Sequence, residues 1–215
     1  MIPLFERYRP RSFAEVVGQD KVVARIQALA KRGLGGRAFW LTGQSGTGKT
    51  TLARLLAAEV ADDFMIREID AGTLTVSALT ELEQETALSG WGNKAGRAVI
   101  INESHGLRRD TIRQLLVTLE RIPGHVLWIF TTTNEAQEAL FEDYPDASPL
   151  LSRCLRLDLA RRDLAKAFAL RAQWIAQQEG LDGRPLDTYL RLVQKHRQNL
   201  RAVLQEVEAG AMLAE

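Results

Sequence analysis

The sequence is poor in the features that mark several large classes of protein. Cys154 is its single cysteine, which excludes an internal disulfide framework and a cysteine-based zinc site and suits a reducing cytosol. No apolar run approaches the roughly 20 residues that span a bilayer. The N-terminal residues mix charges with aromatic rings and lack the apolar segment of a signal peptide. These absences predict a cytoplasmic protein that does not act at a membrane.

An excess of charge of either sign is also missing. The 28 Lys and Arg residues almost balance the 27 Asp and Glu residues, which leaves a net charge of +1. Any affinity for nucleic acid must therefore come from local basic patches. The 46% of hydrophobic and 26% of charged residues are typical of a soluble globular protein, and 215 residues suffice for one domain with a small appendage.

Short apolar runs alternate with helical patterns over the first three quarters of the chain. One helical pattern covers Lys49–Val60, and another places Ile112, Leu115 and Leu119 on one face. This alternation predicts an α/β domain with a parallel five-stranded sheet. The expected strands are Ala38–Thr42, Phe64–Ile69, Ala98–Ile101, Val126–Thr131 and Cys154–Leu159.

After Asp158 the pattern is helical throughout. Gly180 is expected to end a helix, and the turn at Asp182–Pro185 precedes the next one. The last helix carries an apolar stripe made of Leu200, Val203, Leu204 and Val207. We therefore predict two domains, a nucleotide-binding α/β domain at residues 1–159 and a small all-helical lid at residues 160–215.

The strongest motif is GQSGTGKT, which follows an expected strand and opens an expected helix. Its glycines allow backbone N–H groups to converge on phosphate oxygens, and the helix N-terminus adds partial positive charge. Lys49 would reach the β- and γ-phosphates, and the Thr50 hydroxyl would bind Mg²⁺. The pattern predicts that ATP and Mg²⁺ are bound by Gly43, Gln44, Ser45, Gly46, Thr47, Gly48, Lys49, Thr50 and Thr51.

A second motif, VIINESHGL, places Asn102 and Glu103 at the carboxyl end of a buried strand, where parallel sheets bind ligands. An acidic residue usually holds Mg²⁺ at the first of these positions. Asn102 offers an acceptor oxygen without negative charge, so we expect weakened metal binding. Glu103 remains available as the base that activates water. The alternative interpretation is a polar strand end without catalytic function.

Four segments together resemble the clamp-loader ATPases of the AAA+ class, namely the bacterial DnaX type and the small subunits of replication factor C. The opening RYRPRSFAEVVGQDKVV and the stretch ESHGLRRDTIRQLLVTLERIPGHV are similar to segments of this family. So are SPLLSRCLRLDL, which contains a Ser-Arg-Cys motif, and NLRAVLQEVE. The resemblance runs in order along nearly the whole chain and implies an ATPase module with a helical lid.

The resemblance also implies roles for individual residues. The adenine pocket would be lined by Tyr8, Arg9, Pro10 and the stretch Val17, Gly18 and Gln19. Thr133, or alternatively Asn134, would sense the γ-phosphate or the attacking water. Arg153 would act on ATP bound by a neighbouring subunit, and Arg201 would reach the γ-phosphate of its own ATP. Guanidinium groups suit these roles because the transferred phosphoryl group spreads negative charge over its oxygens.

Arg108, Arg109 and Arg113 form a basic cluster after Glu103. In clamp loaders the corresponding helix faces DNA, and such phosphate contacts would be independent of sequence. The alternative interpretation is an ordinary solvated helix face.

The chain departs from the family pattern in several places. Asn102 replaces the aspartate, a four-cysteine zinc module is missing, and the segment Phe141–Ala147 looks like an insertion. No segment follows the lid that could form the collar domain of clamp loaders, so we expect that domain to be absent.

Three functions remain open at this point. The first is an ATP-hydrolysing clamp-loader-type subunit that acts on DNA or on a sliding clamp, within a homo- or hetero-oligomer whose interfaces carry ATP. The second is an ATP-binding switch or adaptor that hydrolyses little. The third is a recombination or repair ATPase of the RarA or RuvB type.

Overall fold

The computed structural model describes residues 2–133, 136–137, 148–160 and 162–214. By their contacts the residues form two compact units. The sheet unit comprises Ala24–Gly43 and Lys49–Asp158, and the helical unit comprises Met1–Val23, Gln44–Gly48 and Leu159–Glu215. The N-terminal residues thus group with the C-terminal helices. The domain boundary between residues 159 and 160 stays a prediction.

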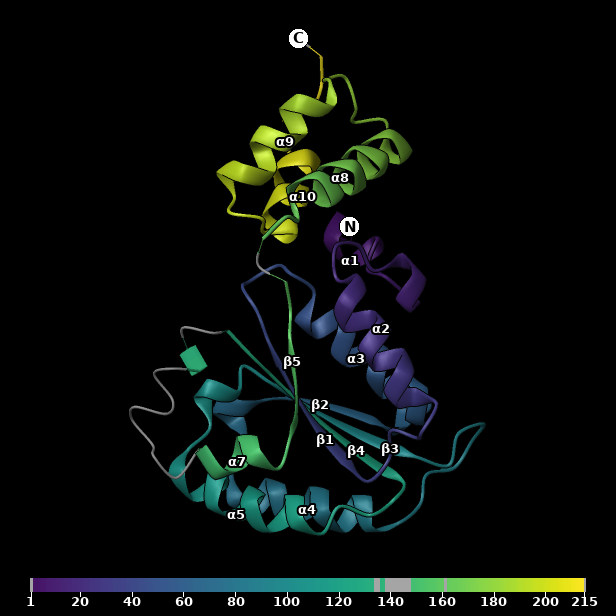
Figure 1. Ribbon diagram of the computed structural model, residues 1–215, viewed down its shortest axis with the longest axis vertical. Coiled ribbons are helices and arrows are strands. Elements are labelled where there is room, and N and C mark those ends of the chain that lie inside the picture. Colours follow the sequence, from purple (N-terminus) through teal and green to yellow (C-terminus); the bar gives the residue numbers. More distant parts are fainter. Residues whose placement is uncertain (1, 134–135, 138–147, 161, 215) are drawn as a thin grey trace. The chain divides into compact units, whose positions relative to one another are not determined.

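The sheet has five parallel strands in the order β2-β3-β4-β1-β5, which confirms the predicted parallel five-stranded sheet (Figure 1). Because β1 lies between β4 and β5, both of its edges are paired, and the loop that follows it starts from a buried strand. The strands are β1 (Arg37–Thr42), β2 (Ile66–Asp70), β3 (Arg97–Asn102), β4 (Val126–Thr132) and β5 (Leu155–Asp158).

All five expected strands differ from the observed strands by one or two residues at one or both ends. β2 was predicted to start at Phe64, but Asp63–Met65 forms a 3₁₀ turn (η2) and the strand begins at Ile66. Phe64 is 57% exposed, so its ring does not take part in the sheet. β5 is one residue shorter at each end than the predicted Cys154–Leu159. An apolar run alone does not say which of its residues the neighbouring strand pairs with.

Helices cover both faces of the sheet (Figure 1). On one face α3 (Lys49–Val60) packs against β1, β3 and β4 and buries Leu52 and Leu56 completely. On the other face α4 (Val76–Ala87), α5 (Arg109–Glu120) and α7 (Ser148–Ser152) enclose a core around Trp40, Trp128 and Phe130. Each such buried side chain stabilises the fold by about 1.5–3 kcal/mol. This packing fixes the strand ends that carry the candidate site.

The helical unit has its own core, built by α8 (Ala165–Glu179), α9 (Leu186–Lys195) and α10 (Leu200–Glu208). As predicted, α8 ends at Gly180, whose φ of 69° is left-handed. The short helix α1 (Leu4–Arg7) packs against α10, and Leu4 is buried in this core. The core also contains Phe168, Ile175, Tyr189, Val193, Val203, Leu204 and Val207.

α2 (Asp20–Ala30) begins in the helical unit and continues into the sheet unit. Among the described residues no helix combines the length and the apolar character needed to cross a membrane.

Candidate nucleotide-binding site

The loop between β1 and α3 has the backbone shape that its glycines predict. Gly46 (φ 75°) and Gly48 (φ 103°) are both left-handed, a region that residues with a Cβ rarely adopt. The Thr47 hydroxyl donates to the Gln44 carbonyl oxygen at 2.8 Å and closes the turn. α3 starts at Lys49, so the loop leads directly into the positive end of a helix dipole. This geometry suits a bound anion.

Lys49 is held against the start of the same loop. Its side chain is only 8% exposed, and Nζ donates to the Gly43 carbonyl oxygen at 2.9 Å. Thr50 and Thr51 follow in the first turn of α3, where Thr50 is half-buried and Thr51 is buried. The ammonium group and the Thr50 hydroxyl therefore lie at the helix end that the motif assigns to phosphate.

Gly46 lies against the N-terminal cap of α10, a contact that the sequence did not predict. A Cβ placed on Gly46 would come within 1.9 Å of Asn199 Oδ1. That same oxygen accepts a hydrogen bond from Ala202 N at 3.2 Å and so caps α10. A glycine at position 46 is therefore required twice, by its φ angle and by this close approach.

Gln19 connects the phosphate loop with the start of the C-terminal segment. Its amide nitrogen lies 3.4 Å from both Thr47 O and Ala160 O, and its Oε1 accepts from Ala160 N at 2.7 Å. Gln19 is 1% exposed, so these bonds satisfy a buried amide. Gly18 (φ 74°) packs on Leu164. The predicted adenine stretch Val17–Gln19 is thus brought next to the phosphate loop.

Tyr8, Arg9 and Pro10 are half-buried. The Tyr8 hydroxyl donates to Glu179 at 2.5 Å, and this hydrogen bond raises the pKa of Tyr8. Its ring meets Trp174 edge to face. Arg9 forms a two-bonded ion pair with Glu6.

Asn102 bridges two neighbouring strands at the carboxyl end of β3. Its Nδ2 donates to Glu68 Oε1 on β2 at 2.7 Å, and its Oδ1 accepts from Thr131 Oγ1 on β4 at 2.9 Å. Glu68 in turn forms an ion pair with Arg54 on α3 at 2.8 Å. An aspartate at position 102 would place a second carboxylate against Glu68. The neighbouring glutamate thus gives a physical reason for an uncharged amide here.

Glu103 has a left-handed backbone (φ 51°, ψ 50°), which is uncommon for a residue with a side chain and costs on the order of 1–3 kcal/mol. Its Oε2 lies 3.5 Å from His105 Nδ1. The same His105 nitrogen is 3.3 Å from Thr132 Oγ1 at the end of β4. Sequence reasoning missed His105 as a neighbour of the predicted base, although its position two residues further on was a usable signal.

Thr133 follows directly after β4, as expected for a residue at the carboxyl edge of the sheet. Its Oγ1 accepts from Ala136 N at 3.4 Å, and its carbonyl oxygen accepts from the Thr132 hydroxyl at 3.2 Å. The alternative sensor, Asn134, lies outside the described residues, as does the segment Phe141–Ala147.

Arg153 follows α7 and is held within the sheet unit. Its guanidinium group forms an ion pair with Glu120 at the end of α5 and donates to Pro149 O at 3.0 Å. The hydrogen bond from Arg153 lowers the pKa of Glu120. Arg153 Nε is buried without a hydrogen-bond partner among the described residues. Among the described residues the terminal nitrogens of Arg153 thus have hydrogen-bond partners, whereas Nε has none.

Arg201 occupies the second position of α10 and is exposed. Its guanidinium carbon lies 5.5 Å from the centre of the Phe5 ring, a cation–π contact. Because Asn199, two residues earlier, touches Gly46, the first turn of α10 lies next to the phosphate loop.

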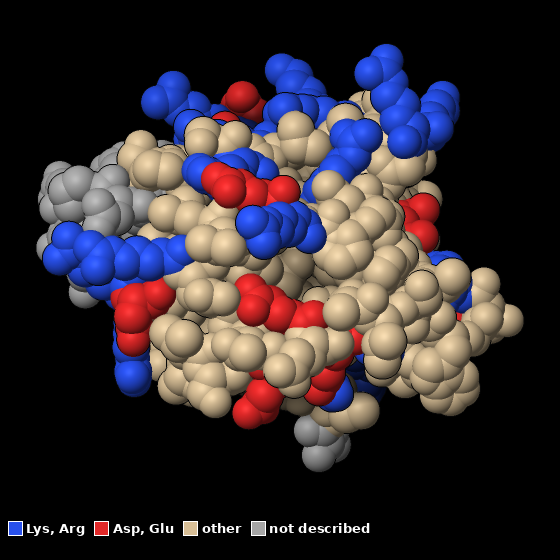
Figure 2. Space-filling model, turned by 90° about the horizontal axis from the view of Figure 1, so that it is seen from below, with Lys and Arg blue, Asp and Glu red and all other residues tan. Residues whose placement is uncertain are grey.

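The three arginines of the basic cluster are all exposed at the start of α5. Figure 2 shows the molecule from the side of α4 and α5, with basic side chains gathered along the upper margin and both acidic and basic ones across the middle. The cluster itself consists of Arg108, Arg109 and Arg113.

Bacterial DNA polymerase III subunits have sequences similar to this chain. The tau subunits of DNA polymerase III from Salmonella typhimurium and Escherichia coli are each 30% identical over 185 residues, which is 75% of this chain and 27% of theirs. The gamma subunit from Buchnera aphidicola subsp. Baizongia pistaciae is 31% identical over 190 residues, or 77% of this chain and 49% of that subunit. The chain thus spans about a quarter to a half of these relatives.

Solved structures of Thermotoga maritima RuvB share the fold. One variant superimposes with a TM-score of 0.73 at 21% identity, over 94% of this chain and 65% of that one. The structure titled as the RuvB Holliday junction branch migration motor gives 0.69 at 22% identity. The model of the ATPase family associated with various cellular activities (AAA) matches residues 39–157, more than half of the chain. The chain belongs to the AAA ATPase family and is related to the tau and gamma subunits of DNA polymerase III.

Proposed function

We propose that this chain binds ATP with Mg²⁺ at the loop Gly43–Thr50 and hydrolyses it as a clamp-loader-type subunit in an oligomer. The observation that carries the proposal is the loop itself, with left-handed Gly46 and Gly48 before a helix that starts at a buried Lys49. Backbone N–H groups of residues 44–48 would surround the phosphates, and Lys49 would exchange its bond to Gly43 for phosphate oxygens.

The residues near the strand ends fit a magnesium ion that is held mainly by nucleotide phosphates. Among the described residues no group of three or more acidic, histidine or cysteine side chains converges as a metal site. Mg²⁺ needs few protein ligands when phosphates and waters complete its octahedron. The Thr50 hydroxyl would bind it directly, and Asn102 Oδ1 would accept from one of its waters. When bound, the ion would neutralise charge on the β- and γ-phosphates.

Glu103 is the proposed base. It would accept a proton from the water whose oxygen attacks the γ-phosphorus, while the bond to the β–γ bridging oxygen breaks. Its left-handed backbone aims the side chain away from the regular course of β3, and His105 lies within reach to orient it. Thr133, at the end of the adjacent strand, would contact the γ-phosphate or this water.

Two arginines would stabilise the charge that develops on the γ-phosphoryl group. Arg201 would act in cis, from the turn of α10 that begins beside Gly46. Arg153 would act in trans, on the nucleotide of a neighbouring subunit, after giving up its ion pair with Glu120. The adenine would be bound by Tyr8, Arg9, Pro10 and Val17, with Gly18 and Gln19 beside it.

Relatives named as subunits of a DNA polymerase favour DNA, or a protein bound to it, as the object of this ATPase. The exposed arginines Arg108, Arg109 and Arg113 would contact phosphates without reading sequence. A sliding clamp is a candidate partner on the same grounds. A stronger affinity for a four-way junction than for a primed duplex would instead favour a function like that of RuvB, whose fold the chain shares.

The decisive experiment measures ATP affinity and steady-state turnover of the purified chain with Mg²⁺, with and without primed DNA. Lys49→Ala should lower the affinity about a hundredfold, because two charge-assisted hydrogen bonds are lost. Lys31→Ala is the matched control, since Lys31 is exposed in the same unit. Equal affinity in both variants would contradict nucleotide binding by this loop.

The interface mechanism has a separate test in Arg153→Ala. This variant should keep ATP affinity and lose turnover, with Arg156→Ala as a control on the neighbouring strand. Mixing it with Glu103→Gln should restore part of the activity, because each variant supplies the group that the other lacks. Normal turnover of Arg153→Ala alone would exclude a trans-acting finger.

A second candidate is an ATP-binding switch with little hydrolysis. The observation that favours it is the pairing of Asn102 with Glu68 and Thr131, which leaves no carboxylate at the usual magnesium position. Tight ATP binding without turnover, with or without DNA, would support this function over the first.

A further inference from the structure

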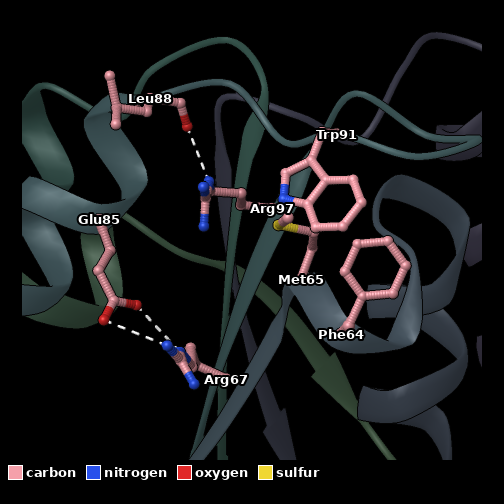
Figure 3. A pocket seen from close by; sticks show the side chains of 7 residues that line it. All are labelled: Phe64, Met65, Arg67, Glu85, Leu88, Trp91 and Arg97. Atoms are coloured by element: carbon pink, nitrogen blue, oxygen red, sulfur yellow. Dashed lines mark hydrogen bonds and ion pairs between the residues drawn. The ribbon is translucent and has the colours of Figure 1, made fainter.

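A pocket of about 490 Å³ lies at the amino ends of β2 and β3 (Figure 3). Asn102 and Glu103 lie at the opposite end of β3, about 16 Å away for a strand of this length. The pocket therefore has no part in the proposed nucleotide site. It is lined by Phe64, Met65, Arg67, Glu85, Leu88, Trp91 and Arg97.

Three large apolar side chains lie open to solvent around this pocket. Trp91 is 70% exposed, Leu88 68% and Phe64 57%. The Phe64 and Trp91 rings contact each other, with centroids 4.8 Å apart and planes tilted by 45°. Apolar side chains grouped in this way are a common mark of a protein-binding surface. Aromatic rings in particular contribute large contact areas with little loss of side-chain freedom.

The loop that presents Trp91 is fixed by its own hydrogen bonds. Gly90 N donates to Ala95 O at 2.8 Å and closes the loop. The Asp62 carboxylate accepts from Asn93 N at 2.6 Å and from Lys94 N at 3.2 Å. Gly92, with φ of 117°, lies so close to Asp62 and Phe64 that a Cβ would overlap both. The exposed indole is thus held in place before any partner binds, which reduces the entropic cost of binding.

Of the two arginines that line the described part of the pocket, Arg67 has a carboxylate partner, whereas Arg97 bonds only to a carbonyl oxygen. Arg67 forms two hydrogen bonds with Glu85, at 3.0 and 3.2 Å, so its charge is balanced within the pocket (Figure 3). Arg97 uses Nε for Leu88 O at 2.8 Å, and its terminal nitrogens have no partner among the described residues. Arg97 is half-buried, and its guanidinium group points toward Leu88 in the same pocket as the two rings (Figure 3). Such a group favours a carboxylate, which can accept two parallel hydrogen bonds from it.

We propose that this pocket binds a segment of another protein in which an apolar side chain is next to a glutamate or aspartate. The apolar side chain would lie against Trp91 and Phe64, and the carboxylate would bind Arg97. A nucleic acid fits less well, because its repeated phosphates would meet the carboxylates of Glu85 and Asp62. Of the two arginines among the described lining residues, Arg67 is paired with Glu85 and Arg97 has no charged partner, which suits a single incoming carboxylate.

The test uses the full chain and a defined peptide, serine-rich with a central glutamate-phenylalanine-glutamate sequence. Binding is followed by NMR at the indole N–H signal of Trp91, which Trp91→Phe identifies among the four tryptophans. We expect this signal to shift on titration, and Arg97→Gln to weaken the affinity about tenfold. Arg32→Gln, a change at an exposed arginine of the same unit, should leave the affinity unchanged.

Several outcomes would overturn the proposal. One is the absence of a shift at millimolar peptide; another is equal binding by a peptide with glutamines in place of the glutamates. Tighter binding of an oligothymidylate at the Trp91 signal would make the pocket a nucleic-acid surface. Self-association that Trp91→Ser abolishes would make it an interface between copies of this chain. Unfolding curves of each variant, measured in parallel, separate lost binding from lost structure.

Discussion

The phosphate loop is shaped by its backbone, whereas the carboxyl end of β3 is organised by side chains. In the loop, two left-handed glycines and a helix start form the proposed anion site, and Gly46 is confined by Asn199. At the end of β3, an amide bridge joins Glu68, Asn102 and Thr131, and His105 lies beside Glu103. At Gly46 the first region leaves no room for a side chain. In the second region the Asn102 amide lies between a carboxylate that accepts and a hydroxyl that donates, which favours an uncharged residue at this position.

The largest effect is expected from a change of Glu103 at the end of β3, which should affect ATP turnover but not ATP affinity. Glu103→Gln should lower ATP turnover by about 10²–10⁴, because the water would lose its proposed base. ATP affinity should stay unchanged, since in the proposed function the loop binds the phosphates. Turnover assays and equilibrium binding of a fluorescent nucleotide measure the two quantities. If ATP affinity fell as much as turnover, Glu103 would contribute to nucleotide binding as well as to hydrolysis, which would contradict this prediction.

Gly46→Ala tests whether the loop needs its close approach to Asn199, and its effect is measured as ATP turnover and nucleotide affinity. The new Cβ would displace the loop from Asn199 by about an ångström or more, and a misplacement of this size can cost about a hundredfold in turnover. Gly33→Ala is the matched control, because Gly33 has a similar φ of 81° with nothing within 4 Å of a Cβ. Both variants carry the backbone strain, and only the first carries the overlap. The double change Gly46→Ala with Asn199→Ala should recover part of the activity.

A smaller effect is expected from Asn102→Asp. The added carboxylate would lose the bond to Glu68 and face its charge, which should lower the free energy of unfolding by about 1–3 kcal/mol. Turnover should change less than tenfold. Combining it with Glu68→Gln should restore the stability, as urea unfolding of the four variants would measure. A large rise in turnover from Asn102→Asp alone would instead favour the ATP switch.

The contrast between the two regions also explains what could be predicted from the sequence. Glycine spacing specifies a backbone, so the loop, its strand and its helix were all predicted with nearly correct ends. The parallel sheet followed from apolar runs, and the residues wrongly placed in a strand were Phe64 and Met65 in η2 and Cys154 and Leu159 at the ends of β5. The C-terminal helices and the stop at Gly180 followed from helical spacing.

Contacts between distant segments could not be predicted in this way. Nothing in the sequence near Asn102 indicates that Glu68, 34 residues earlier, would hold its amide. Nor does any local pattern join Asn199 to Gly46, or Gln19 to Ala160. Such partners depend on the register of strands and the packing of helices, which no single stretch of residues encodes. The position of the pocket around Trp91 was missed for the same reason.

Because Asn199 lies against Gly46, hydrogen exchange at the backbone amide of Ala202 can report changes in the phosphate loop. Ala202 N donates to the Asn199 oxygen that touches the phosphate loop. Hydrogen–deuterium exchange at this amide requires the helix cap to open. If a nucleotide tightens the loop against Asn199, the cap should open less often and exchange at Ala202 should slow. A single exchange rate would then report nucleotide occupancy without any label.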